Sequence, residues 1–112
     1  AHDSHNIICV GTSDEDMAFA VNRIARNRGG IVVVENGQVL AELPLEIAGI
    51  ISGKPLREVN TLLEDAKKAA HALGVGTDID PFMTLSFMSL PVIPTLRLTT
   101  RGVVDVNTQQ YV

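Results

Sequence analysis

The sequence has few of the residues that stabilise a small domain through cross-links or a large aromatic core. Cys9 is the only cysteine among 112 residues, so no disulfide can form within the chain, and this fits a reducing, cytoplasmic environment. Tryptophan is absent and aromatic residues make up 4% of the chain, so a core must be built from aliphatic side chains and methionine. No run of residues approaches the ~20 apolar positions that a membrane-spanning helix needs.

Basic residues are scarce as well. The chain has 9 Lys and Arg against 13 Asp and Glu, which is a formal net charge of −4. Nucleic acids and anionic membranes bind to basic patches, so neither is expected as a partner. Arg23, Arg26 and Arg28 form the only local basic cluster. We interpret them as the solvated face and the C-terminal end of a helix, because that end favours cations.

What the sequence does have is the composition of one globular domain. Hydrophobic residues make up 46% of the chain, close to the usual value for folded proteins. A chain of this length can bury roughly two-thirds of its unfolded surface. No repeat, low-complexity stretch or linker interrupts it, so we interpret residues 1–112 as a single domain.

The first third of the chain alternates apolar runs with helix signals. Residues 5–10 predict a first strand, and their continuous apolar part indicates that both faces are covered. Residues 12–16 hold two alternative capping boxes, in which a hydroxyl is followed three residues later by a carboxylate, and these predict a helix to about Arg28. Residues 31–35 predict a second strand, which would complete a right-handed βαβ unit.

Two turn signals predict hairpins. Asn36-Gly37 accepts positive φ at both positions, so a tight turn should join residues 31–35 to an antiparallel strand at residues 38–42. A second hairpin, around Arg101-Gly102, is predicted to join residues 96–99 to residues 103–106.

Helix signals dominate the middle of the chain. Residues 45–51 are ambiguous and are interpreted as a short helix. Pro55 suits the first position of a long amphipathic helix that Gly74 ends. Asp80 then caps a short helix over residues 82–88. The predicted fold class is α/β, with α+β as the alternative: a mixed sheet of about five strands with a βαβ unit, two hairpins and two to four helices packed on it.

The densest polar cluster directly precedes the first predicted strand. It consists of His2, Asp3, Ser4, His5 and Asn6. A structural zinc site needs four ligands and a catalytic one three plus water, and His71 is the only other histidine, so metal binding is disfavoured. A nucleophile–base–carboxylate triad is disfavoured too, because alternate side chains point to opposite faces. Hydrogen bonding at a sheet edge or between domains is the favoured interpretation.

One apolar segment is also open to two interpretations. Phe82, Met83, Phe87 and Met88 are interpreted chiefly as core, with a surface buried against another domain as the alternative. Cys9 lies in an apolar run and is interpreted as a small buried hydrophobe rather than a nucleophile.

The chain resembles the carboxy-terminal region of bacterial and archaeal adenine deaminases over essentially its whole length. Generic strand and turn pieces contribute, among them residues 30–37, 43–49 and 98–105. The distinctive segments are His2-Asp3-Ser4-His5-Asn6-Ile7 and Asp80-Pro81-Phe82-Met83-Thr84-Leu85-Ser86-Phe87, which continues through Leu90-Pro91-Val92-Ile93-Pro94.

The resemblance implies an enzyme of the amidohydrolase superfamily that converts adenine and water to hypoxanthine and ammonia. Such enzymes use manganese or iron, held in a (β/α)₈ barrel upstream of this region, to activate the attacking water. Eight βα units need roughly 250 residues, which this chain lacks. The metal-binding His-x-His pair is absent, because two residues separate His2 from His5. No catalytic residue and no metal ligand is therefore assigned to this chain.

We expect the chain to be a fragment of a larger cytoplasmic enzyme, inactive alone, whose partners are the barrel domain, adenine and further copies in a homo-oligomer. The polar cluster at residues 2–6 would help close the purine pocket or contact the barrel. The apolar segment at residues 82–90 would serve assembly or stability. The alternative is a free-standing, non-catalytic module for small-molecule binding or oligomerisation.

Overall fold

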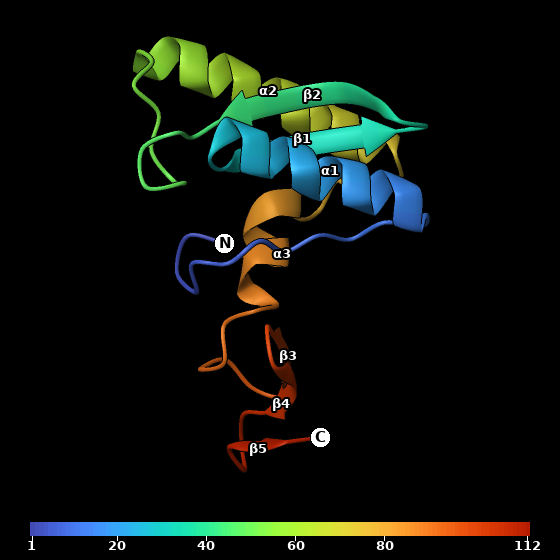
Figure 1. Ribbon diagram of the computed structural model, residues 1–112, viewed down its shortest axis with the longest axis vertical. Helices are drawn as coiled ribbons and strands as arrows, with labels where there is room; N and C mark the ends of the chain where they lie inside the picture. The colour runs from blue at the N-terminus through green and yellow to red at the C-terminus, as the bar shows by residue number, and fades with distance from the viewer.

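A computed structural model describes all 112 residues and has three helices and five strands in two separate small sheets (Figure 1). In chain order the elements are α1 (Asp14–Asn27), β1 (Gly30–Glu35), β2 (Gln38–Pro44), α2 (Leu56–Ala72), α3 (Pro81–Phe87), β3 (Leu96–Thr99), β4 (Gly102–Asp105) and β5 (Gln110–Tyr111). The α+β alternative and the two hairpins are confirmed; five strands are present, but residues 5–10 are not one of them.

The larger part of the molecule is a β-hairpin between two helices. Strands β1 and β2 pair antiparallel, α1 packs mainly on β1, and α2 packs mainly on β2 (Figure 1). The core between hairpin and helix is formed by Val33, Ala66 and Ala70, which are at most 7% exposed. The two alanines allow α2 to approach the sheet closely. Only 9 of the 112 residues are buried, so the chain has a thin core.

The predicted βαβ unit and single mixed sheet are wrong. Residues 7–10 form no strand, and β2 is the only partner of β1. The residues just before this segment are hydrogen-bonded to Ser89, near the end of α3, and not to the hairpin. A continuous apolar run indicates an extended, partly covered segment, but it does not specify a pairing partner.

Local turn signals were reliable. Asn36 and Gly37 have φ of 52° and 72°, as a tight hairpin requires. The turn is also held from outside, because the Asp16 carboxylate of α1 accepts hydrogen bonds from the backbone N–H groups of Asn36 (2.9 Å) and Gly37 (2.7 Å). Ser13 is the actual cap of α1, since its hydroxyl accepts from the Asp16 N–H at 3.1 Å.

The later helices begin close to the predicted positions. The Asp80 carboxylate caps α3 by accepting from Phe82 N–H (3.1 Å) and Met83 N–H (3.0 Å). Pro55 is the N-cap of α2 and not its first helical residue. Gly74, with φ of 111°, follows the end of that helix as predicted.

The short helix predicted at residues 45–51 is wrong. The backbones of Ile47 and Ile51 instead close a tight turn with two hydrogen bonds of 2.9 and 3.0 Å. Ala48 and Gly49 both have positive φ, which excludes a helix. Gly49 packs directly on Gly29, where a Cβ would lie 2.3 Å from the Gly49 Cα.

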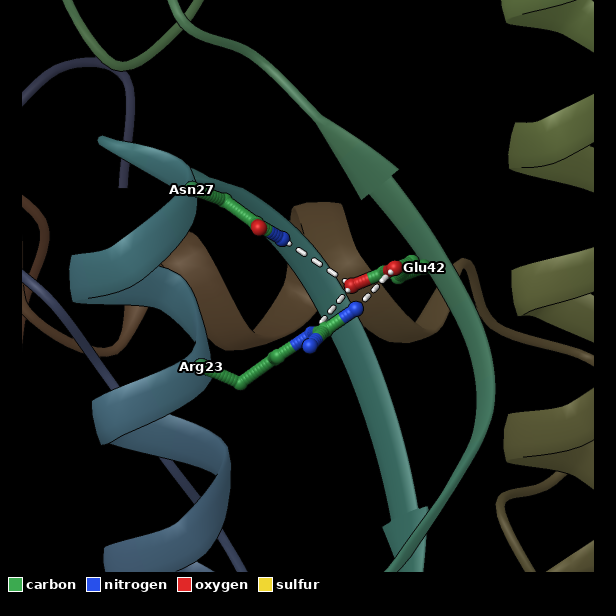
Figure 2. Close-up of polar contacts among 3 residues, drawn as sticks. All are labelled: Arg23, Asn27 and Glu42. Carbon is green, nitrogen blue, oxygen red and sulfur yellow. Dashed lines mark hydrogen bonds and ion pairs between the residues drawn. The ribbon is translucent and has the colours of Figure 1, made fainter.

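A partly exposed ion pair joins α1 to β2 (Figure 2). Arg23 donates two hydrogen bonds to the Glu42 carboxylate, at 2.8 and 2.7 Å, and Asn27 adds a third at 3.0 Å. The hydrogen bonds from Arg23 are the main reason that the pKa of Glu42 falls from 4.5 to about 2. The interpretation of Arg23 as part of a solvated face is therefore wrong: it faces β2.

The second sheet lies beyond α3, at the end of the molecule away from α1 and α2 (Figure 1). Its order is β3-β4-β5, and β5 was not predicted. Backbone hydrogen bonds from Leu98 to Met88 (2.9 Å) and from Val106 to Thr95 (2.8 Å) hold it to the preceding segment. None of the helices has both the length and the apolar character needed to cross a membrane.

Candidate functional site

Residues 2–6 form a tight turn that we call the polar turn. A backbone hydrogen bond of 3.0 Å runs from His5 N–H to the Ala1 carbonyl, and the Ala1 nitrogen donates to the Asn6 carbonyl at 3.1 Å. His5 has a φ of 53°, a left-handed conformation that costs free energy in a residue other than glycine. After this turn the chain runs towards the start of α1 (Figure 1).

Two members of the polar turn anchor it to the rest of the molecule. The hydroxyl of Ser89, a residue that is 2% exposed, lies 2.8 Å from Ser4 Oγ and 3.3 Å from Asn6 Oδ1. Ser4 also donates to Asn6 Oδ1, and Ser89 reaches the Ser86 carbonyl at 3.1 Å. Burial makes each of these bonds costly to lose, because an unpaired buried hydroxyl costs ~1–3 kcal/mol.

The contribution of Ser89 was not predicted. The residue lies 83 positions from Asn6, and nothing in the sequence connects the two. One signal was available: Ser89 is a hydroxyl in the apolar stretch from Phe82 to Leu90, and a polar group in such a stretch needs a partner.

The three ionisable members of the polar turn face solvent. His2, Asp3 and His5 are all exposed. The His2 ring contacts the edge of Phe87 in a T-shaped arrangement, with ring centroids 6.0 Å apart. The structure therefore divides the cluster into anchors, Ser4 and Asn6, and presented groups, which are two imidazoles and one carboxylate.

The polar turn forms neither a metal-ligand cluster nor a nucleophile–base–carboxylate triad within this chain. No group of three or more His, Cys, Asp or Glu side chains is placed to hold a metal ion, so these residues do not fit the manganese or iron of the resemblance. The Ser4 hydroxyl bonds to Asn6 and Ser89 and makes no hydrogen bond to His5, so a triad is not formed. The presented groups can donate and accept hydrogen bonds to a polar partner.

Two hollows of the surface lie away from the presented groups. A hollow of ≈ 130 Å³ lies between Asn6–Cys9 and Leu98–Thr100, and another of ≈ 360 Å³ lies beside β5. Neither is lined by His2, Asp3 or His5. Cys9 lines the first hollow, and burial raises the pKa of its thiol, which disfavours the nucleophilic thiolate.

The apolar candidates also divide into two kinds. Phe82 packs against the core, and Phe87 lies half-buried beneath His2. Met83 and Met88 are instead 48% and 47% exposed. The first pair stabilises the fold, and the second pair is available to a partner.

The chain exposes more surface than a free-standing protein of its mass. Its accessible surface is 7397 Å², whereas a monomer of 12.0 kDa has about 6,000 Å². The surplus of about 1,400 Å² exceeds the ~800 Å² that one partner buries in a standard interface. Eighteen large hydrophobic residues are exposed. This surplus is the pattern of a domain that packs against something else.

Fold and site together define a small α+β domain with an exposed polar turn and exposed apolar surface. The family described as "Adenine deaminase C-terminal domain" matches residues 1–110, and the chain belongs to this family.

Individual relatives agree with the family assignment. The chain is 54% identical over 108 residues to "Adenine deaminase 2" of Carboxydothermus hydrogenoformans, which covers 96% of this chain and 19% of the relative. It is 50% identical to "Adenine deaminase" of Nitratidesulfovibrio vulgaris, over 99% of this chain and 20% of the relative. With "Adenine deaminase" of Geobacillus kaustophilus it shares 46% identity, over 100% of this chain and 19% of the relative. The chain thus spans about a fifth of the length of these relatives.

Proposed function

We propose that this chain acts within an adenine deaminase, as the C-terminal domain of a longer enzyme that converts adenine and water to hypoxanthine and ammonia. The names of relatives at about 50% identity support the reaction, and their greater length leaves room for a catalytic domain. We place the manganese or iron outside residues 1–112, because no three His, Cys, Asp or Glu side chains of this chain converge to hold a metal ion. The cytoplasmic location rests on the single cysteine.

Within that enzyme, we propose that the polar turn helps to close the purine pocket. The observation that carries this role is its division into buried anchors and presented groups. Ser4 and Asn6 hold the turn against Ser89, so the backbone that carries His2, Asp3 and His5 has less freedom to lose on binding. A carboxylate can accept hydrogen bonds from an amine or ring N–H of a purine, and an imidazole can donate to or accept from its ring nitrogens.

Alanine substitutions in the full-length enzyme test the pocket role. Asp3→Ala and His5→Ala are expected to lower kcat/KM for adenine at least ~10-fold, the effect of losing ~1.4 kcal/mol of transition-state stabilisation. Asp65→Ala is the matched control, because Asp65 is an exposed carboxylate on α2 that forms no ion pair. Unchanged kcat/KM in both turn variants, with folding intact by circular dichroism, would rule this role out.

A separate experiment tests the proposal that the catalytic centre lies outside this chain. The isolated 112-residue chain, supplied with Mn²⁺ or Fe²⁺, is expected to show no ammonia release from adenine above the uncatalysed rate. Measurable metal-dependent turnover by this chain would contradict the proposal that the catalytic centre lies elsewhere.

A role in assembly is the second candidate, and the exposure of Met83 and Met88 favours it. Met88→Glu in the full-length enzyme is expected to reduce the oligomer size measured by light scattering. Leu56→Glu is the control, because Leu56 is 84% exposed and lies at the start of α2. If Met88→Glu, like the control, keeps the oligomer size and thermal stability of the unaltered enzyme, the surface around Met88 has no role in assembly.

A further inference from the structure

The segment Ile7–Val10 is an extended stretch between the polar turn and α1 that belongs to no strand (Figure 1). None of its N–H or C=O groups takes part in a backbone–backbone hydrogen bond of the molecule. The nearest polar contact is the Cys9 thiol, 4.0 Å from the Val10 carbonyl oxygen. Four consecutive residues thus leave their main-chain hydrogen-bonding groups without an internal partner, so these groups are free to bond to water or to another chain segment.

Both ends of this segment are fixed. On one side Asn6 is hydrogen-bonded through Ser89 to the end of α3, and on the other side Ser13 caps α1. The segment is therefore held in place across the molecule and is not a free terminus. A strand held in this way has already lost much of the conformational entropy that pairing would cost.

The side chains of this segment suit a covered strand better than an open edge. Ile7 and Val10 are 48% and 74% exposed, while Ile8 and Cys9 are half-buried. Open edges are normally protected from pairing by charged residues, proline or a bulge, and the run Ile-Ile-Cys-Val has no charge and no proline. An edge without these protections is suited to accept another strand.

We propose that residues 7–10 pair with an extended segment of the adenine deaminase chain that lies outside residues 1–112, and so dock this domain by β-strand addition. The inference rests on the proposed function. Two observations support this occupant: about four-fifths of each relative lies outside the matched region, and the chain exposes a surplus of about 1,400 Å². The ≈ 130 Å³ hollow between Asn6–Cys9 and Leu98–Thr100 provides room for a side chain of the incoming strand.

Amide hydrogen exchange in the full-length enzyme tests the pairing. Along one edge of a strand only every second residue directs its N–H and C=O to the neighbour. We therefore expect alternate protection, at either Ile7 and Cys9 or Ile8 and Val10, with exchange at least ~100-fold slower than for an unstructured peptide. Val33, in the β1–β2 ladder, is the internal reference for a protected amide. Exchange of all four amides at the unstructured rate would overturn the proposal.

The identity of the partner strand requires a second measurement. Val10, the most exposed residue of the segment, is replaced by p-benzoylphenylalanine in the full-length enzyme, and the cross-linked peptides are identified by mass spectrometry. We expect a cross-link within the same chain to a peptide outside residues 1–112. A cross-link to a second copy, recognised by mixing isotope-labelled and unlabelled chains, or only to residues within 1–112, would overturn the proposal. Neither measurement depends on turnover, so strand addition can fail while the role of Asp3 and His5 in the pocket stands.

Discussion

Removing the charge of Glu42 should make the domain both less stable and less sensitive to acid. Glu42 accepts two hydrogen bonds from Arg23 and one from Asn27, and together they join α1 to β2 (Figure 2). Glu42→Gln keeps the shape of the side chain and removes its charge. With its oxygen in the place of Oε2 the amide can keep two of the three bonds, from Arg23 Nε and Asn27 Nδ2, but its NH₂ group then faces the Arg23 Nη2 donor at the position of Oε1.

The expected loss of folding stability follows from the pKa of Glu42. A fall from 4.5 to about 2 corresponds to at most ~3 kcal/mol of stability. The side chains of Arg23 and Glu42 remain 32% and 26% exposed, so solvent screening reduces this to ~1–2 kcal/mol. Because the pKa is lower in the folded state, the contribution is complete above about pH 4.5. It is lost as the pH falls from 4.5 towards 2.

Urea unfolding of the 112-residue chain, followed by circular dichroism between pH 7 and pH 3, measures both effects. Glu42→Gln should lose ~1–2 kcal/mol at pH 7, and its stability should change less than that of the unaltered chain as the pH falls. Glu35→Gln is the control, since Glu35 is an exposed carboxylate on the same hairpin that forms no ion pair. Parallel pH profiles for the unaltered chain and Glu42→Gln would refute this account of the ion pair.

Two further predictions concern backbone geometry and capping. Gly29→Ala should cost ~3 kcal/mol or more, because its Cβ would lie 2.3 Å from the Gly49 Cα at a φ of +122°, whereas Gly37→Ala, in open space at +72°, should cost only ~1 kcal/mol. Equal losses in urea unfolding would show that the Gly29 contact is unimportant. Asp80→Ala should cost ~1–2 kcal/mol by removing the α3 cap, while Asp80→Asn keeps the cap, loses only the 3.0 Å pair with Lys67, and should cost less than half as much. Thermal unfolding compares the two, and an Asn variant as unstable as the Ala variant would contradict the capping role.

Several features were determined by the sequence alone because each depends on residues only a few positions apart. The Asn36-Gly37 turn, the Asp80 cap and the stop at Gly74 all lie where the sequence predicts them. The long helix follows from apolar residues that recur at three and four positions along α2. The distinctive segments around His2 and Asp80 were also sufficient to indicate the family that the whole-chain match confirms.

Tertiary structure decided which distant segments meet. The sequence predicted a strand at residues 5–10 and paired it with β1, but strand pairing depends on which surfaces the helices leave free, and here the turn before that segment is bound to Ser89 instead. The pairing of Arg23 with Glu42, 19 residues apart, was hidden for the same reason. Only the folded chain could separate the polar turn into two anchors and three presented groups, because burial of a hydroxyl depends on packing from residues more than 80 positions away.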